Sequence, residues 1–245
     1  MKENIILGIV QGVFEWIPIS SEGVVALLSQ YLIDDLHAID VALFLHLGTI
    51  FAVFIYFFED WKKVLLFKDK ELLRFLIIAT LASAPVAFLL YSVILNMVLG
   101  SFLLFLTGFG LLFTAYFHKK KKKIRVKKDT LALIAGLMQG FAVIPGLSRS
   151  ASTIFGLSLG EKDPKEILKL SYMMSAPLIL GGSFYLFLKD PVILFNSWPA
   201  LLISFVVGVL TLKVIFALSQ TVNFFKFALF FSFLCFSGGV LTLFI

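Results

Sequence analysis

Cysteine and charge are both scarce in this sequence. The single cysteine, Cys235, lies in the apolar run FFSFLCFSGGV, and charged residues make up only 15% of the 245 positions. One cysteine excludes a disulfide framework and a cluster of metal-binding thiolates. The low charge, with a hydrophobic content of 60% and 29 phenylalanines, excludes an ordinary soluble domain, which could not bury so much apolar surface. The sequence therefore predicts a protein that lies in a bilayer.

Long apolar runs indicate how often the chain crosses that bilayer. A spanning helix needs about 20 predominantly apolar residues. Six segments meet this requirement, at residues 41 to 58, 75 to 95, 97 to 117, 170 to 188, 198 to 218 and 227 to 245. We therefore expect an all-α integral membrane protein with six transmembrane helices.

Two further regions, residues 5 to 32 and 131 to 160, are apolar but interrupted by proline, glycine, serine and charge. The second aligns with the first: Gly136 with Gly8, Gln139 with Gln11, Gly140 with Gly12 and, after a one-residue gap, Pro145 with Pro18 and Ser148 with Ser21. We predict that each is a re-entrant helix-loop-helix segment followed by three spanning helices. An odd number of crossings between two such units inverts the second. The chain is thus predicted to be an inverted internal repeat, with units 1 to 117 and 131 to 245 joined by a linker, 118 to 130.

The distribution of lysine and arginine tests this topology independently, because short cytoplasmic loops are enriched in both. The linker 118 to 130 carries eight of the 21 basic residues, and loop 59 to 74 carries five. The opposite loop, 33 to 40, has neither lysine nor arginine. We expect a multi-pass protein of the cell membrane with a cytoplasmic linker and both termini outside. The net charge of +6 is then a topology signal, and no nucleic-acid partner is expected.

Charged and hydroxyl side chains gather in the two broken segments. Ionisable residues at membrane depth are costly and indicate function, and Glu15, Glu22 and Arg149 are such residues. The Pro-x-x-Ser pattern places Ser21 and Ser148 near helix starts, whose free N–H groups attract anions. The combination indicates a phosphate site beside a catalytic carboxylate. The alternative is that serine and glycine serve helix packing and that Arg149 pairs with Glu15 only to stabilise the loops.

Two motifs carry a family resemblance. The segment GxxQGxxEWxPISSEG, residues 8 to 23, and PGLSRSAS, residues 145 to 152, resemble the bacitracin-resistance family of undecaprenyl-diphosphate phosphatases. The resemblance extends to LHLGTIFAV, residues 45 to 53, and SYMMSAPLILGG, residues 171 to 182. It implies an enzyme that hydrolyses undecaprenyl (polyprenyl) diphosphate to the monophosphate and so recycles the lipid carrier for cell-envelope glycans. It also implies six spans with two re-entrant loops, a site open to the outside, a divalent cation (Mg²⁺ or Ca²⁺) and a homodimer.

Site roles follow from the same resemblance. Glu15 matches the family's indispensable glutamate, Ser21 its proposed nucleophile and Arg149 the arginine that holds the diphosphate. Glu15 is also the candidate metal ligand. The expected substrate-binding residues are Ser20, Gln11, Glu22, Gly146, Ser148 and Ser150.

The sequence departs from the family pattern at two positions. Gln11 stands where bacterial members usually have a first glutamate, and Val24 where they have a histidine. His46 is another candidate for the histidine's role, although a histidine there is more often a helix-packing group.

The sequence allows two mechanisms, which differ in the nucleophile. In one, Ser21 attacks the terminal phosphorus with help from Glu15 or Glu22; in the other, Glu15 activates water for direct attack. A rival function is a carrier that moves polyprenyl phosphate across the membrane without hydrolysis, since transporters also use inverted repeats with broken helices. A third candidate function is that of a phosphatase for another lipid diphosphate.

Overall fold

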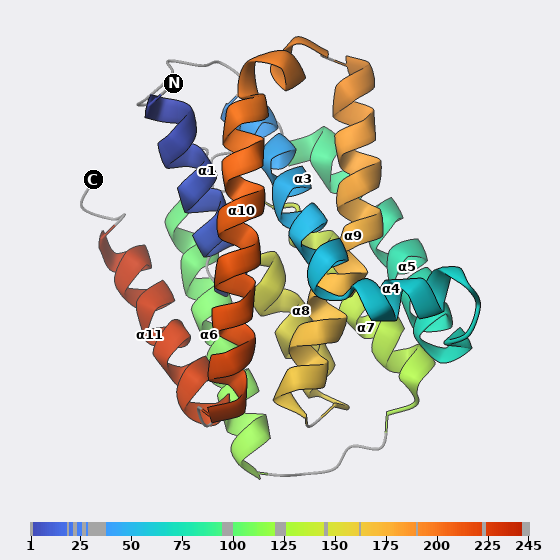
Figure 1. Ribbon diagram of the computed structural model, residues 1–245. Helices are drawn as coiled ribbons and strands as arrows, with labels where there is room; N and C mark the ends of the chain where they lie inside the picture. Colours follow the sequence, from blue (N-terminus) through green and yellow to red (C-terminus); the bar gives the residue numbers. More distant parts are fainter. Residues whose placement is uncertain are drawn as a thin grey trace.

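A computed structural model describes residues 2–18, 20–21, 24–25, 28, 38–94, 100–120, 126–144, 147–161, 163–189, 191–221 and 224–241. The regular elements in this part of the chain are all helices (Figure 1). They are α1 (Lys2–Phe14), α3 (Ala38–Tyr56), α4 (Phe58–Leu65), α5 (Lys70–Ile94), α6 (Gly100–Lys120), α7 (Lys128–Phe141), α8 (Arg149–Ser158), α9 (Pro164–Lys189), α10 (Pro191–Thr221) and α11 (Phe224–Leu241).

Three helices of the described chain are long and apolar enough to cross a bilayer: Lys70–Tyr91 of α5, Pro164–Lys189 of α9 and Ser197–Ser219 of α10. The pair Val41–Tyr56 and Phe58–Leu65 makes a fourth if it is counted as one bent span, and Phe225–Val240 is a shorter apolar helix. The protein is therefore an all-α, multi-pass membrane protein. Of the six predicted spans, 75–95, 97–117 and 227–245 each extend into residues outside the described part, so the full count stays a prediction.

The connection at residues 59–74 contains a helix that the sequence analysis did not predict. Residues 59–74 do not form a simple connection, because the chain bends by 84° after Tyr56 and continues as α4. This short helix is amphipathic: Trp61 and Val64 are buried, while its acidic and basic residues face outward. Hydropathy alone does not detect such a helix, because its polar face lowers the average below that of a span.

Both broken segments consist of a helix, a break and a second helical stretch. The first runs from α1 through a turn at residues 15–18 to helical residues 21, 24, 25 and 28, and the second runs from α7 through a turn to α8. In Figure 1, α1 occupies the upper part of the bundle and α7 the lower part, and both end near its middle. The described residues of both segments thus show a helix, a break and further helical residues, and the re-entrant course of the two segments stays a prediction.

Glycines in the two related segments allow close helix crossings. α1 packs along α10, and α7 packs along α5. A Cβ atom on Gly8 would lie 2.5 Å from the backbone oxygen of Ala200, and one on Gly136 would lie 2.5 Å from that of Ala79. Any larger residue would force these helices apart, which explains why the same pattern needs glycine in both places.

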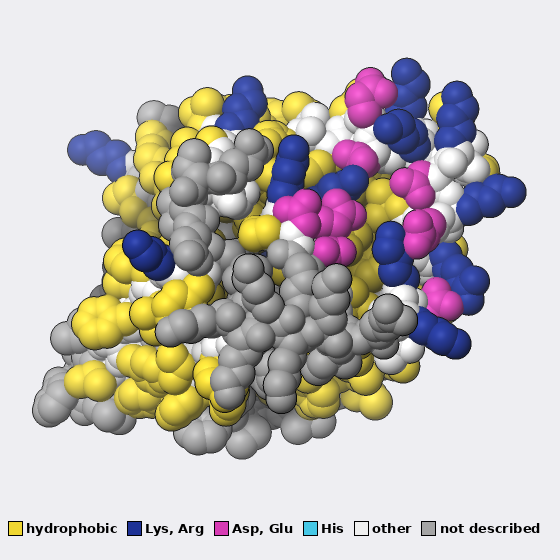
Figure 2. All heavy atoms as spheres, turned by 90° about the horizontal axis from the view of Figure 1, so that it is seen from below, with side chains coloured by type: hydrophobic (Ala, Val, Ile, Leu, Met, Phe, Trp, Pro, Cys, Tyr) yellow, Lys and Arg dark blue, Asp and Glu magenta, His cyan; other side chains and the backbone are white. Residues whose placement is uncertain are grey.

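Charge is concentrated at one end of the bundle. Viewed from below, the molecule shows many lysine, arginine, aspartate and glutamate side chains (Figure 2). Ion pairs there join elements distant in sequence: Lys169 to Asp60 at 2.7 Å, Lys128 to Glu71 at 3.0 Å and Arg74 to Asp129 at 2.5 Å. The start of α1 and the end of α11 point towards the opposite end in Figure 1.

The turn after α1 is held by later helices. Trp16 is almost completely buried, and its indole N–H donates to the backbone oxygen of Gly208 at 3.0 Å. The Tyr172 hydroxyl donates to the backbone oxygen of Trp16 at 2.8 Å, and the two rings meet edge to face at 5.1 Å. These contacts tie the first break to α9 and α10, so the neighbouring Glu15 has a defined position.

Candidate active site

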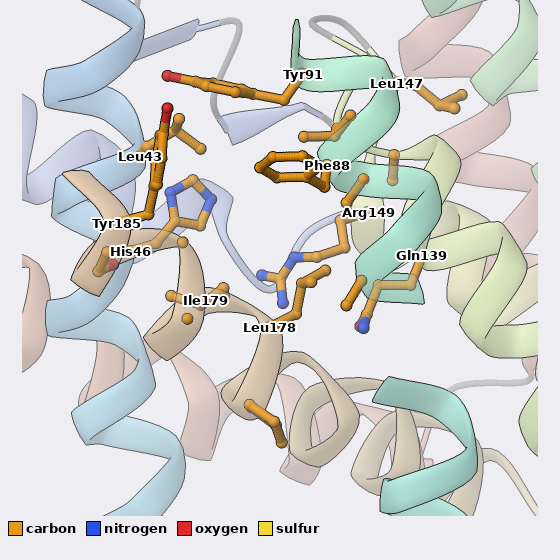
Figure 3. A pocket seen from close by; sticks show the side chains of 18 of the residues that line it. Leu43, His46, Phe88, Tyr91, Gln139, Leu147, Arg149, Leu178, Ile179 and Tyr185 are labelled. Atoms are coloured by element: carbon orange, nitrogen blue, oxygen red, sulfur yellow. The ribbon is translucent and has the colours of Figure 1, made fainter. Parts of the chain in front are cut away.

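A cavity of about 340 Å³ lies where the two broken segments meet α3, α5 and α9 (Figure 3). Most of its lining is apolar, but one cluster of polar residues faces it. The members of this cluster are Glu15, Ser20, Ser21, His46, Thr80, Gln139, Ser148, Arg149, Ser150 and Ser183, together with two tyrosines. A mostly apolar cavity with a few convergent polar groups is typical of a small-molecule or lipid-headgroup site.

Glu15 is the centre of the polar group. Its residue is 3% exposed, and donors converge on both carboxylate oxygens. Oε2 accepts hydrogen bonds from Gln11 Nε2 at 2.7 Å and from Ser21 Oγ at 2.8 Å. Oε1 pairs with Nη2 of Arg149. An ionised carboxylate is an acceptor only, so this set of donors suits a charged Glu15.

Arg149 comes from the other broken segment, as the first residue of α8. Its guanidinium points into the cavity in Figure 3. A buried arginine and carboxylate compensate each other, and removal of either partner leaves a costly unpaired charge. The pairing proposed from sequence is therefore present, and its position at the cavity wall leaves the guanidinium accessible to an anionic ligand.

Serines cap the start of α8 beside Arg149. Ser148 is the N-cap, and its Oγ accepts from the Ala151 N–H at 3.2 Å. The hydroxyls of Ser148 and Ser150 lie 3.1 Å apart, and Ser150 Oγ donates to the backbone oxygen of Ile17 at 3.0 Å. These contacts join the two broken segments and leave a helix start, with its positive dipole end, at the cavity.

His46 of α3 also reaches the site, although sequence reasoning favoured a packing role for it. Its Nε2 lies 3.2 Å from Glu15 Oε2, and its Nδ1 lies 2.8 Å from the backbone oxygen of Ala42. The sequence feature that could have identified His46 as a site residue is its position as an ionisable side chain in an otherwise apolar spanning segment.

Gln139 is a second cavity residue that the sequence analysis did not select. Its Nε2 donates to Ser83 Oγ and to the backbone oxygen of Met174, each at 3.2 Å. Its Oε1 is buried and has no hydrogen-bond partner among the described residues. The alignment of Gln139 with Gln11 was the signal that could have found it.

Comparison with known proteins identifies the family of this chain. A family model described as "Bacitracin resistance protein BacA" matches residues 4–237. The chain belongs to this family. It is 33% identical to a protein of Methanococcoides burtonii over 99% of this chain and 97% of that one, and 33% identical to a protein of Haloarcula marismortui over 97% of each. A protein of Thermosipho africanus is 34% identical over 86% of this chain and 88% of its own. All three are named undecaprenyl-diphosphatase.

Only some of the remaining predicted site residues of this BacA-family chain line the cavity. Gln11 is buried against Glu15 and is not among the cavity-lining residues, so its contact is with the carboxylate. Val24 is half-buried and also does not line the cavity. Ser20 lines it. Glu22 and Gly146 lie outside the described residues.

Glu15 is the residue that the sequence suggests as a ligand for a divalent cation. No three histidine, cysteine, aspartate or glutamate side chains gather within the described residues to hold a metal ion. Mg²⁺ is usually held by one or two carboxylates together with substrate phosphate oxygens, and Glu15 is the carboxylate among the described residues that line this cavity. A divalent cation at Glu15 stays a prediction, and the chemistry described below uses no step through it.

Proposed function

We propose that this protein is a membrane phosphatase that hydrolyses undecaprenyl diphosphate to the monophosphate and inorganic phosphate. The monophosphate returns to use as the lipid carrier for cell-envelope glycan synthesis. The observation that carries the proposal is the convergence of Ser21 and Arg149 on the buried carboxylate of Glu15 inside an apolar cavity. Membership of the BacA family and relatives with this name support it.

Arg149 and the start of α8 hold the diphosphate. A guanidinium donates two parallel hydrogen bonds to phosphate oxygens and stays charged when it is removed from water. The backbone N–H of Ser150, in the first turn of α8, adds a donor for the same anion, whereas the N–H of Ser148 donates to Thr107 Oγ1 at 3.3 Å. When the diphosphate binds, Arg149 shares its donors between Glu15 and the phosphate, so that the guanidinium keeps a charged partner throughout.

Ser21 is the nucleophile that this geometry favours. Its hydroxyl already donates to Glu15 Oε2, as a general base requires. Glu15 takes the proton as Ser21 Oγ bonds to the terminal phosphorus and the bridging P–O bond breaks, and it passes that proton to the departing polyprenyl monophosphate. The carboxylate, ionised again, deprotonates a water that attacks the phosphoserine, and it returns this second proton to Ser21 Oγ as inorganic phosphate leaves. Direct attack by water remains the alternative version, and a trapped phosphoserine distinguishes the two.

The prenyl chain leaves the cavity between α5 and α9. A volume of about 340 Å³ is at the lower end of the range for small-ligand pockets, so it admits the diphosphate and the first prenyl units only. Gly181 and Gly182 line the cavity and are exposed, and an added Cβ atom on either meets no described heavy atom within 4 Å. Phe88 on α5 lines the opposite wall and is 65% exposed. This gap is the apolar passage for the tail.

The full architecture belongs to the same proposal. It has six spans and two re-entrant segments in an inverted repeat, divided at the basic linker 118–130. The matching packing of α1 on α10 and α7 on α5 supports the repeat. The charged lower end of the bundle (Figure 2) supports a cytoplasmic linker with both termini and the cavity mouth outside. A homodimer stays a prediction.

The decisive experiment measures phosphate release from undecaprenyl diphosphate and shorter polyprenyl diphosphates by the purified protein, with and without divalent cations. We expect release from the wild type and almost none from Ser21→Ala, which leaves the arginine in place. A wild type that releases no phosphate under any condition but moves polyprenyl phosphate between leaflets would establish the carrier instead.

A further inference from the structure

The short helix α4 projects sideways from the lower half of the bundle (Figure 1). The chain bends by 84° between α3 and α4, so α4 runs nearly at right angles to a helix of the membrane bundle. Lys169 on α9 pairs with Asp60 on α4 at 2.7 Å and holds α4 against the bundle. This direction suits a helix that lies along the plane where hydrocarbon meets lipid headgroups.

The sides of α4 have different surroundings. Trp61 and Val64 are buried against the bundle. Phe58 and Leu65 are exposed, and because they lie seven positions apart, which is two helical turns, they share one side of α4. Lys62 is exposed and lies one turn from each of them. An apolar strip beside a lysine is the pattern of a helix in a membrane interface.

The turn after α4 holds an aromatic side chain outward at a cost in backbone strain. The backbone of Phe67 has a φ of 56°, a left-handed conformation in which glycine is usual. The Lys68 N–H donates to the Lys63 oxygen at 2.8 Å and the Phe67 N–H to the Val64 oxygen at 3.0 Å, which is the Schellman arrangement. The Phe67 side chain is 68% exposed, so packing against described residues offsets little of this strain. Strain of this kind indicates function, and insertion of the ring into a bilayer would supply the missing burial.

Positive charge surrounds the same apolar side chains. Three exposed lysines of this segment form no ion pair with a described residue: Lys62, Lys63 and Lys68. Asp60 is compensated by Lys169, and Asp69 accepts from the Leu72 N–H at the start of α5 at 2.9 Å. Glu59 is the remaining acidic residue of α4. A surplus of positive charge beside exposed apolar side chains matches a lipid with an anionic headgroup.

We propose that residues 58–68 are an interfacial anchor that binds anionic phospholipid of the surrounding bilayer. The three lysines bind headgroup phosphates, and the exposed apolar side chains insert among the upper acyl chains; these are Phe58, Leu65, Leu66 and Phe67. Because α4 connects α3 to α5 and both helices line the cavity, the anchor fixes the depth of that wall in the bilayer. Its placement in the cytoplasmic leaflet rests on the proposed orientation, whereas the lipid contact itself does not.

Insertion into lipid is measured with a bimane label on Leu65→Cys in a Cys235→Ala background. The protein is placed in vesicles of phosphatidylcholine and phosphatidylglycerol that are brominated in the upper part of their acyl chains. We expect strong quenching of the label, because Leu65 is exposed on the apolar side of α4. Lys165→Cys, exposed at the start of α9, is the matched control and should be quenched much less. Equal quenching at both positions, or none at Leu65, overturns the proposal.

Phe67→Gly separates anchoring from folding. Glycine adopts the left-handed conformation without strain, so we expect the variant to melt at the wild-type temperature or higher in detergent without phospholipid. Quenching of the Leu65→Cys label should nevertheless fall by at least about half, because the inserted ring is lost. Unchanged quenching, or a lower melting temperature in detergent, would show that Phe67 serves only the packing of the protein itself.

The role of charge is tested with the combined substitution Lys62→Gln, Lys63→Gln and Lys68→Gln. We expect phosphatidylglycerol to raise the wild-type melting temperature more than phosphatidylcholine does, and this variant to lose most of the difference. The matched control removes the same charge from exposed lysines of α9, α10 and α11: Lys165→Gln, Lys213→Gln and Lys226→Gln. It should keep the difference.

Equal loss in the two sets of lysine variants would assign the lipid effect to net charge alone and overturn the anchor. A wild type that phosphatidylglycerol stabilises no more than phosphatidylcholine would do the same. None of these measurements uses phosphate release. Failure of the proposed function in the assay above would therefore leave the anchor standing, and failure of the anchor would leave the proposed function standing.

Discussion

The two broken segments share a frame but carry opposite charges. Both have a glycine-rich helix that crosses another helix closely, a break and a Pro-x-x-Ser sequence before a helical stretch. The first places Glu15 four residues after Gln11, where the second has Val143; the second places Arg149 directly after Ser148. The frame therefore brings two helix breaks together, and the two segments differ in the charge that they supply. In the proposed mechanism the segment with Glu15 transfers protons and the segment with Arg149 holds the anion.

The paired glutamines show the same division. Gln11 donates to Glu15, while Gln139 donates to Ser83 and to the Met174 backbone. The same residue type thus orients a charged group in one segment and joins α7 to α5 and α9 in the other. What a repeated residue does depends on the charged neighbour that its own segment supplies.

The largest effect should come from removing the charge of the first segment. We expect Glu15→Gln to lower phosphate release by a factor of about 10² to 10⁴, the usual contribution of a general base, while binding of polyprenyl diphosphate persists through Arg149. The measurement is single-turnover phosphate release beside a binding assay. Glu3→Gln, at the start of the helix α1 that precedes Glu15, is the control and should match the wild type. Comparable loss in both variants would contradict the assignment.

Arg149→Lys tests the second segment. Lysine keeps the charge but loses the planar fork, so we expect more than about tenfold lower turnover. The comparison between segments also predicts weaker substrate binding here than in Glu15→Gln, measured as KM or by direct binding. Near-normal turnover in a folded Arg149→Lys protein would return this residue to the structural role of pairing with Glu15.

Gly182→Phe tests the proposed tail passage, which lies outside both segments. An added Cβ atom at Gly182 meets no described heavy atom within 4 Å, so we expect the protein to fold, but a phenyl group would narrow the passage. We expect about a tenfold loss in kcat/KM with undecaprenyl diphosphate, equivalent to ~1.4 kcal/mol, and a much smaller loss with a short prenyl diphosphate. Gly110→Phe is the matched control, since Gly110 has equally open space and does not line the cavity. Equal losses with both substrates would place the tail elsewhere.

The smallest expected effects on turnover come from replacing the two glutamines, and they should differ between the two segments. Gln11→Leu removes a hydrogen bond to a charged group and should lower turnover by about tenfold. Gln139→Leu removes bonds to neutral partners only, and we expect a loss of a few-fold at most. The reverse order, measured under the same conditions, would show that the second segment takes part in proton transfer.

Much of the site could be predicted from sequence because its motifs are local. Glu15, Ser21 and Arg149 each stand beside a proline-containing break in an apolar stretch, and ionisable residues in such breaks indicate function wherever the segments lie. The membrane character and the two helix-break-helix segments follow in the same way, from hydropathy and from residues that interrupt helices.

Other features were decided only by the tertiary structure. α4 was expected to be part of a loop, because an amphipathic helix across the end of the bundle has no long apolar run. His46 lies 31 positions after Glu15, on a helix that is apolar nearly all round, so no pattern of polar residues indicates which face of α3 meets the cavity. Gln11 was expected to bind substrate, yet packing turns it towards Glu15 and away from the cavity wall. Local sequence determines which residues are able to ionise or break a helix, whereas packing of the helices against one another determines which of them meet.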